Sequence, residues 1–187
     1  LIVASGDLGS AYMGLQVLER EKMVFNENPS IQPDLDGNDY IIQRQLKPQA
    51  SMDIVKQLDE LEIIPSSMID ISDGLASEVM HICKSSKKGC VLYMEKLPID
   101  TKTVSAALDF NLDHNTCALN GGEDYELLFT IKPEDVKNLK RLFLKADTFV
   151  SHIGEITKSP KKITLIKRDG SKVSLKPATG FNHFKRK

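Results

Sequence analysis

Residues 68–75 of the chain, Met-Ile-Asp-Ile-Ser-Asp-Gly-Leu, join a short apolar strand to a polar turn and the start of a helix. Side chains alternate along a strand, so Asp70 faces away from its isoleucine neighbours. Ser72 and Asp73 then fall at the carboxyl end of the strand, where N–H groups of the following helix can bind phosphate. Two carboxylates and a hydroxyl at such an edge suit Mg²⁺, a cation that prefers oxygen ligands and often bridges to phosphates.

A purely local role explains the same residues. Ser72 or Asp73 can cap the helix that follows, and Asp70 can make a local hydrogen bond. Ser-Asp-Gly turns are also common in proteins. However, a carboxylate inside an apolar strand is costly to bury without a partner or a metal. That cost favours the magnesium site, and the local interpretation stays open beside it.

Residues 120–126, Asn-Gly-Gly-Glu-Asp-Tyr-Glu, form a second polar segment just before an apolar, strand-like run. Paired glycines allow unusual backbone conformations and let a ligand approach closely. Period-two alternation places Glu123 and Tyr125 on one side of the chain and Asp124 and Glu126 on the other. Because neighbouring carboxylates repel one another unless cations or donors offset them, we expect at least one to point into a cleft. The alternative is a solvated acidic turn.

Strands and helices alternate around these two segments. The chain ends in a predicted hairpin with its turn at residues 168–171. This order indicates an α/β (α+β) fold in which helices pack on a mixed β-sheet. The apolar patterns predict strands over 1–5, 68–71, 90–94, 125–131, 149–153, 163–166 and 173–175, and helices over 11–18, 51–61, 75–86, 102–108 and 133–144.

The first part of the chain carries weaker signals. Residues 6–9, Gly-Asp-Leu-Gly, follow a predicted strand, and we interpret them as a tight turn because they lack the residues of a phosphate-binding loop. Gly14 lies inside a helical pattern, where a neighbouring segment can approach closely. Residues 22–39 contain two prolines, three asparagines and a glycine, which predicts a mobile loop. Residues 40–46 fit a strand or a helix.

Composition excludes several classes of protein. The 187 residues carry 25 basic and 26 acidic side chains, so a net charge of −1 gives no support to nucleic-acid binding. No apolar run is long enough to span a membrane. Three cysteines cannot all pair, which indicates a reducing, cytoplasmic setting. Because the chain begins inside a strand without an initiator methionine, we expect it to be part of a longer protein.

Together these segments resemble the C-terminal part of the thiamine-monophosphate kinase family, which belongs to the superfamily of aminoimidazole-ribonucleotide synthetase. The resemblance rests on residues 68–75, on Gly-Gly-Glu-Asp-Tyr-Glu-Leu-Leu-Phe at 121–129, and on Gly-Phe-Asn-His-Phe at 180–184. The opening residues 3–10, Val-Ala-Ser-Gly-Asp-Leu-Gly-Ser, resemble the glycine turn that leads into this domain in the family. The implied fold is like the C-terminal domain of aminoimidazole-ribonucleotide synthetase.

The resemblance implies an enzyme that transfers a phosphoryl group from ATP to thiamine monophosphate, giving thiamine diphosphate. By this resemblance Asp70 and Asp73 bind Mg²⁺ and Ser72 contacts ATP. Glu123 contacts the substrate, and Phe181 stacks on thiamine where the family often has tryptophan. Transfer is direct and assisted by Mg²⁺, so no side chain is assigned a catalytic role and no covalent enzyme intermediate is expected.

The resemblance also implies that residues 1–187 are the single C-terminal domain of a two-domain kinase. The N-terminal domain, which carries further Mg²⁺-binding aspartates and most nucleotide contacts in the family, is not in this chain. We therefore expect the chain alone to be inactive and the full-length protein to be a homodimer. Two alternatives stay open: another ATP-using synthetase of the same superfamily, and a non-catalytic ligand-binding domain.

Overall fold

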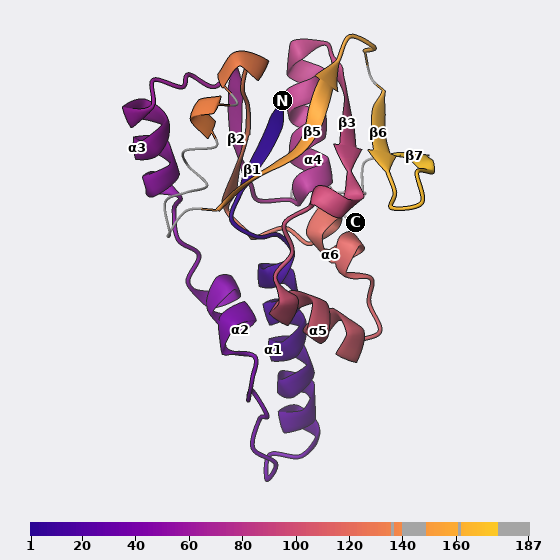
Figure 1. Cartoon of the computed structure of the whole chain (residues 1–187). Helices are drawn as coiled ribbons and strands as arrows, with labels where there is room; N and C mark the ends of the chain where they lie inside the picture. The colour runs from indigo at the N-terminus through magenta and orange to yellow at the C-terminus, as the bar shows by residue number, and fades with distance from the viewer. Residues whose placement is uncertain (136, 140–148, 161, 176–187) are drawn as a thin grey trace, which may run out of the picture.

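A computed structural model describes residues 1–135, 137–139, 149–160 and 162–175 (Figure 1). Seven strands form one sheet in the order β2-β4-β1-β5-β3-β6-β7. All neighbouring strands are antiparallel except β3 and β6, which are parallel, so the predicted mixed sheet is confirmed. The strands are β1 (Ile2–Ser5), β2 (Ser67–Ile71), β3 (Gly89–Tyr93), β4 (Glu126–Thr130), β5 (Val150–Thr157), β6 (Ile163–Ile166) and β7 (Lys172–Ser174).

Helices cover both faces of the sheet. Alternate side chains of β1 point to opposite faces, so Ile2 packs in one apolar cluster with the inner face of α4, and Val3 packs in another with α3. A third cluster joins α1, α2, α5 and α6. The helices are α1 (Ser10–Glu27), α2 (Asp39–Leu46), α3 (Met52–Glu60), α4 (Leu75–Ser86), α5 (Thr101–Asp109) and α6 (His114–Asn120), with 3-10 turns at Met94–Lys96 and Pro133–Asp135.

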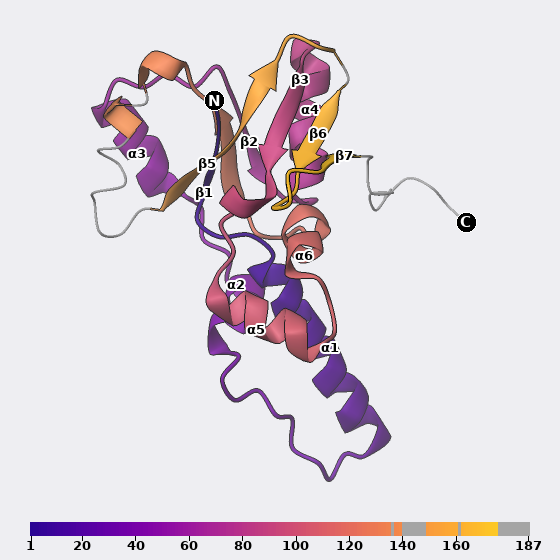
Figure 2. The ribbon, with the colours of Figure 1, turned by 45° about the vertical axis from the view of Figure 1, so that its right-hand side comes forward.

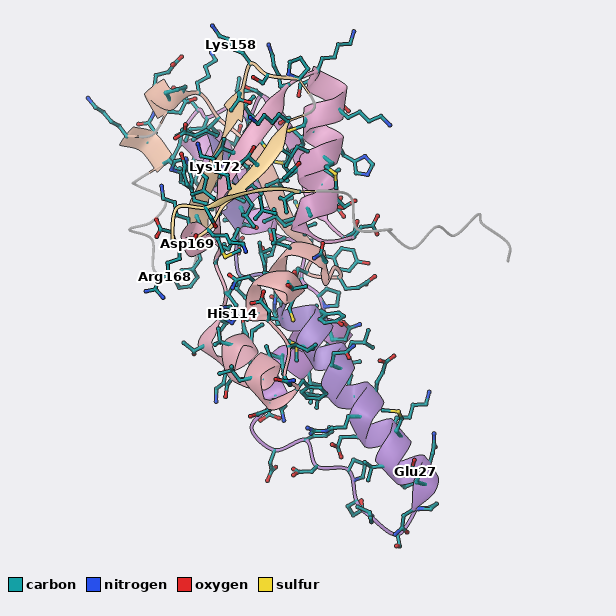
Figure 3. All side chains as sticks on the ribbon, turned by 90° about the vertical axis from the view of Figure 1, so that its right-hand side faces the viewer. Glu27, His114, Lys158, Arg168, Asp169 and Lys172 are labelled. Carbon is teal, nitrogen blue, oxygen red and sulfur yellow. The ribbon has the colours of Figure 1, made fainter. Side chains whose placement is uncertain are left out.

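The third cluster extends away from the sheet. In Figure 2, α1, α2 and α5 lie together below the strands, and the end of α1 projects beyond its neighbours. Glu27, the last residue of α1, and Lys158, which follows β5, lie at opposite ends of the molecule (Figure 3). Within the described residues, no helix is long and apolar enough to cross a membrane.

The prediction of a loop over residues 22–39 is wrong for its first part. Helix α1 continues to Glu27. It ends there because Pro29 disfavours the helical conformation at the residue before it, Asn28. Residues 28–38 are not helical, and they are tied to α1 where Glu21 accepts the N–H of Asp34 at 2.8 Å. Residues 40–46, which fitted a strand or a helix, are helical.

Helix α6 was not predicted from the sequence. Its beginning is fixed by Asp113, because the Asp113 carboxylate accepts the N–H of Asn115. The predicted helix over 133–144 begins as a 3-10 turn at Pro133–Asp135 and is helical at residues 137–139, and its remaining residues lie outside the described part. The other predicted strands and helices are present within a few residues of their expected bounds.

Gly14 allows α1 and α2 to touch. A Cβ at this position would lie 2.1 Å from the carbonyl oxygen of Ile41 in α2, so no larger residue fits without moving backbone. The close approach that the sequence predicted at Gly14 is therefore confirmed.

Replacing Gly14 by alanine is expected to lower the free energy of unfolding by about 1–3 kcal/mol, because overpacking outweighs the gain in helix propensity. Urea denaturation at neutral pH measures this change. The control is Glu19→Ala on the exposed side of the same helix, which should stay within about 0.5 kcal/mol of the unaltered chain. A Gly14→Ala variant as stable as the control would contradict the close packing.

Candidate active site

The backbone brings the two polar segments side by side. Strand β2 pairs with β4 so that Ile71 lies opposite Glu126. Beyond the strand pair, the carbonyl oxygen of Ser72 accepts the N–H of Glu123 at 2.7 Å, and that of Ile71 accepts the N–H of Tyr125 at 2.9 Å. Residues 70–73 and 123–125, which are about 50 positions apart in the sequence, therefore form one surface.

The glycines of both segments serve this contact. A Cβ on Gly122 would lie 2.6 Å from the carbonyl oxygen of Ser72, and one on Gly74 would lie 2.9 Å from the backbone of Asn120. Gly122 and Gly74 also have φ values of 71° and 102°. The sequence predicted close approach at the paired glycines, and here the approaching group is the neighbouring motif of the same chain.

Asp70 and Asp73 are exposed, and Ser72 is half-buried. The expectation that Asp70 pays a burial cost is wrong, because β2 is an edge strand and its side chain faces solvent. The expectation that Ser72 or Asp73 caps the next helix is also wrong. The residue before α4 is Gly74, which has no side chain that could cap the helix. Both carboxylates are therefore left free of a capping role.

The predicted alternation in the second segment is confirmed. Asp124 and Glu126 are buried, whereas Glu123 and Tyr125 are exposed on the same side as Asp70. The Tyr125 hydroxyl donates to the Glu123 carboxylate at 3.1 Å. This hydrogen bond and the negative charge of Glu123 raise the pKa of Tyr125, with smaller effects from burial and from the charges of Asp70 and Asp73.

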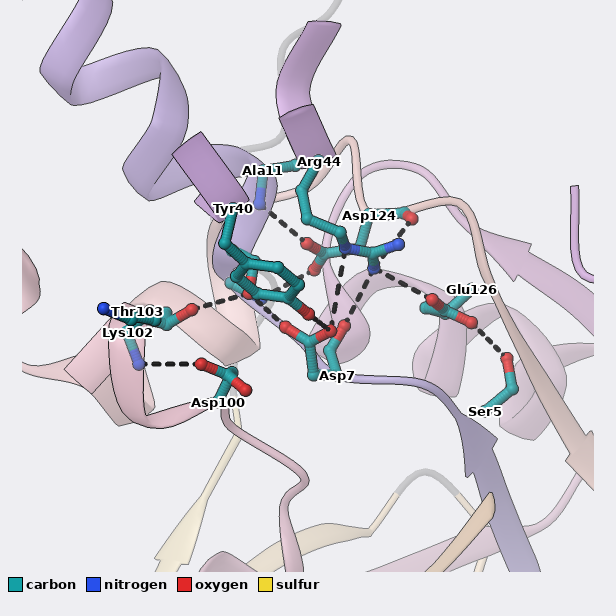
Figure 4. Close-up of polar contacts among 12 residues, drawn as sticks. Ser5, Asp7, Ala11, Tyr40, Arg44, Asp100, Lys102, Thr103, Asp124 and Glu126 are labelled. Atoms are coloured by element: carbon teal, nitrogen blue, oxygen red, sulfur yellow. Dashed lines mark hydrogen bonds and ion pairs between the residues drawn. The ribbon is translucent and has the colours of Figure 1, made fainter. Parts of the chain in front are cut away.

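The buried acids point inward onto specific donors (Figure 4). The Asp124 carboxylate accepts the N–H groups of Gly9 at 2.8 Å and Ala11 at 3.2 Å, at the beginning of α1. The Glu126 carboxylate accepts the Ser5 hydroxyl at 2.5 Å. The 6–9 turn is thus occupied by a carboxylate of the chain itself, which supports its interpretation as a tight turn.

Arg44 of α2 supplies the cation that these acids require. Its guanidinium lies 2.9 Å from Glu126 and 3.6 Å from Asp7, and it donates to the carbonyl oxygens of Asp7 and Asp124 at 3.1 and 3.4 Å. The Tyr40 hydroxyl donates to Asp7 at 2.5 Å (Figure 4). Sequence reasoning predicted that cations or donors must offset the acids, but it did not identify Arg44, since residues 40–46 had no assigned structure.

Glu78 is a second residue that the sequence analysis missed. It lies in the first turn of α4, is 2% exposed, and accepts the N–H of Asp73 at 3.2 Å. Its other carboxylate oxygen is buried without a hydrogen-bond partner. Burial, with smaller effects from the nearby charges of Asp73 and Asp70, raises the pKa of Glu78 to about 7. In the sequence, Glu78 could have been identified because it is an acidic residue on the apolar helix face formed by Leu75 and Val79.

An open cavity of about 360 Å³ adjoins the exposed acids. Asp70 and Tyr125 lie at its polar side, and its other walls come from α3, the segment before it, and β4. The lining is mostly apolar, including Pro48, Met52 and Leu127. The site therefore combines a carboxylate-rich edge with an apolar hollow large enough for part of a small organic molecule.

Comparison with known proteins assigns the chain to a family. The profile of the AIR synthase related protein, C-terminal domain, matches residues 7–167. The chain belongs to this family. It is 36% identical to the thiamine-monophosphate kinase of Buchnera aphidicola (subsp. Schizaphis graminum) over 98% of this chain and 52% of that protein. It is 33% identical to the Escherichia coli K12 enzyme over the same shares.

Solved structures agree with the family assignment. The structure of AaThiL complexed with AMPPCP and TMP superimposes with a TM-score of 0.71 and 27% identity, over 98% of this chain and 50% of that one. The thiamine-monophosphate kinase of Stenotrophomonas maltophilia gives a TM-score of 0.72 and 25% identity, over 90% and 49%. The resemblance predicted from the motifs is confirmed. The chain spans about half the length of the curated relatives it matches.

The exposed edge of this family member fits a hydrated Mg²⁺ ion. Mg²⁺ usually takes one or two protein carboxylates and completes its shell with water and phosphate oxygens. Asp70 and Asp73 offer such carboxylates, and Glu78, which accepts the Asp73 N–H with one carboxylate oxygen, has its other oxygen buried without a hydrogen-bond partner. Among the residues that the structure describes, no group of three or more His, Cys, Asp or Glu side chains is placed to hold a metal. Phe181 lies outside the described residues.

The three cysteines, Cys83, Cys90 and Cys117, are buried and free. They behave as small core side chains.

Asp124 gives the folded chain a measurable pH dependence. Burial raises its pKa to about 7, although the N–H groups of Gly9 and Ala11 and the charge of Arg44 act in the opposite direction. The carboxyl of the unfolded chain titrates near the ordinary value of 3.8. Between these two values the native state holds a proton that the unfolded state lacks, so the free energy of unfolding falls as pH rises.

We expect Asp124→Asn to remove part of this fall between pH 5 and 8, as measured by urea denaturation at several pH values. Asp109→Asn, which removes an exposed carboxylate, should keep the slope of the unaltered chain. An Asp124→Asn variant with an unchanged slope would show that Asp124 does not titrate in this range.

Proposed function

We propose that the protein carrying this chain transfers the γ-phosphoryl group of ATP to thiamine monophosphate and so forms thiamine diphosphate. The observation that carries the proposal is the 2.7 Å hydrogen bond from the Glu123 N–H to the Ser72 carbonyl oxygen, which joins the two polar segments at one exposed edge. The likeness to AaThiL, complexed with AMPPCP and TMP, supports it, because AMPPCP is an analogue of ATP. The family relatives named thiamine-monophosphate kinase support it as well.

In the proposed site, Asp70 and Asp73 bind Mg²⁺, Ser72 contacts ATP, and Glu123 and Phe181 contact thiamine monophosphate. The exposure of Asp70, Asp73 and Glu123 supports these roles, because each carboxylate is open to a ligand. The adjoining apolar cavity suits a ring system better than it suits a phosphate.

The residues of the site favour direct transfer between the two phosphates. Phosphoryl transfer asks the protein mainly to align its substrates and to stabilise the charge on the transferred group. Mg²⁺, when bound, offsets the negative charge of the phosphates. Asp70 and Asp73 would hold the Mg²⁺ ion at the edge of β2, and Glu123 would orient the acceptor, thiamine monophosphate. We therefore assign no nucleophile to this chain.

We propose further that residues 1–187 are the single C-terminal domain of a two-domain kinase. The match to about half the length of each relative supports this division. The other half would supply the remaining magnesium and nucleotide contacts and the homodimer interface. The three free cysteines fit a cytoplasmic protein.

The 187-residue chain alone is expected to form no measurable thiamine diphosphate from ATP and thiamine monophosphate, because part of the phosphate charge stays unscreened. Chromatographic detection of the product measures this, with a full-length relative as positive control. Turnover equal to that of the relative would contradict the division of the site. Stimulation of ATP hydrolysis by another small substrate would favour a different synthetase of the superfamily.

In the complete gene product, Asp70→Asn and Asp73→Asn are each expected to weaken Mg²⁺ binding in the presence of AMPPCP by at least about tenfold. Isothermal titration calorimetry measures the affinity. Asp53→Asn is the control, since Asp53 is an exposed carboxylate on α3, with 83% of its side chain accessible. Equal affinity in all three variants would rule out the proposed magnesium site.

A further inference from the structure

The second polar segment has an unusual backbone. Glu123 and Tyr125 have φ values of 64° and 52°, in the left-handed region that residues with a side chain rarely adopt. Such a conformation is energetically unfavourable and persists only where the surroundings enforce it. Two strained residues in three positions therefore require a strong constraint, and the residue between them, Asp124, is 1% exposed.

Asp124 is tied to a part of the chain far away in sequence. Its two carboxylate oxygens accept the N–H groups of Gly9 and Ala11, more than 110 positions earlier. Gly9, the residue before α1, has no side chain that could cap the helix. The Asp124 carboxylate caps it instead. A carboxylate at a helix N-terminus is also favoured by the helix dipole. The guanidinium of Arg44 holds the Asp124 carbonyl oxygen at 3.4 Å.

This anchor determines what its neighbours can do. Asp124 is drawn inward, whereas its neighbours Glu123 and Tyr125, with their left-handed backbone, face outward. Their N–H groups then reach the carbonyl oxygens of Ser72 and Ile71. The Tyr125 hydroxyl in turn holds the Glu123 carboxylate at 3.1 Å. The direction of the Glu123 side chain thus depends on a residue that does not itself face the site.

We propose that Asp124 is a positioning residue, which uses the N-terminus of α1 to hold Glu123 in its outward, left-handed conformation over the edge formed by residues 70–73. The proposal rests on the proposed contact between Glu123 and thiamine monophosphate. It assigns Asp124 no contact with substrate or metal.

The first test measures the positioning directly, by hydrogen exchange of the Glu123 and Tyr125 N–H groups in the complete gene product. Asparagine at position 124 can accept one N–H group, but its amide nitrogen then faces the other donor. At about pH 8, above the pKa of about 7 of Asp124, where both of its oxygens accept, Asp124→Asn is expected to speed exchange at both groups by about tenfold, the effect of losing one hydrogen bond. Asp100→Asn, which alters the cap of α5, should leave both rates unchanged.

The second test asks whether Asp124 acts through Glu123. Binding of thiamine monophosphate is measured by calorimetry for Glu123→Gln, Asp124→Asn and the double variant. We expect each single change to weaken binding by about tenfold and the double variant to be no weaker than Glu123→Gln alone, because coupled residues are not additive. A helix cap with a merely structural role would leave the affinity of the folded variant unchanged.

The outcomes separate the two proposals. If Glu123→Gln binds normally while Asp124→Asn still speeds exchange, the proposed role of Glu123 fails and the positioning of the turn stands. If Glu123→Gln weakens binding and Asp124→Asn changes neither exchange nor binding, the role of Asp124 is overturned. Should Asp124→Asn not fold, Asp124→Glu replaces it, since glutamate keeps the charge but its longer side chain moves the carboxylate away from the N–H groups of Gly9 and Ala11. Unchanged exchange in that variant would also overturn the proposal.

Discussion

The neutralisation of buried carboxylates by Arg44 is the constraint on which the site depends. Asp124 and Glu126, two positions apart in the sequence, are both buried, and a buried carboxylate is stable only when a charge or several donors compensate it. Arg44 compensates Glu126 with an ion pair of 2.9 Å and also contacts Asp7 at 3.6 Å. Because Arg44 comes from α2, the close packing of α2 on α1 at Gly14 supports the site indirectly.

A second consequence of this arrangement is that the acids of the two polar segments, residues 68–75 and 120–126, fall into two sets. The inward set is compensated within the chain by Arg44, by the N–H groups at the start of α1, and by the hydroxyl of Ser5. The outward set, Asp70, Asp73 and Glu123, lies at an exposed edge. The net charge of −1 conceals this division, because it counts both sets together with distant lysines.

The sequence predicted what depends on neighbouring residues and failed where distant segments meet. The strand, turn and helix of 68–75 and the alternation of 123–126 are local patterns, and both are confirmed. The exposure of Asp70 depends on the position of β2 at the edge of the sheet, which no local pattern encodes. The role of Arg44 required knowing that α2 packs beside the start of β4 and the 6–9 turn.

The exposed set of acids favours the binding of the proposed cation. Like charges at one edge repel, and the effect is visible where Asp73 and Asp70 add to the burial that raises the pKa of Glu78 to about 7. Within the described part of the chain, Asp124 and Glu126 meet donors or a cation, whereas Asp70 and Asp73 at the end of β2 are exposed, so a positive ligand at that place offsets their charge. A divalent cation is the ligand that relieves this repulsion and also attracts a phosphate, which is the chemistry that the proposed transfer requires.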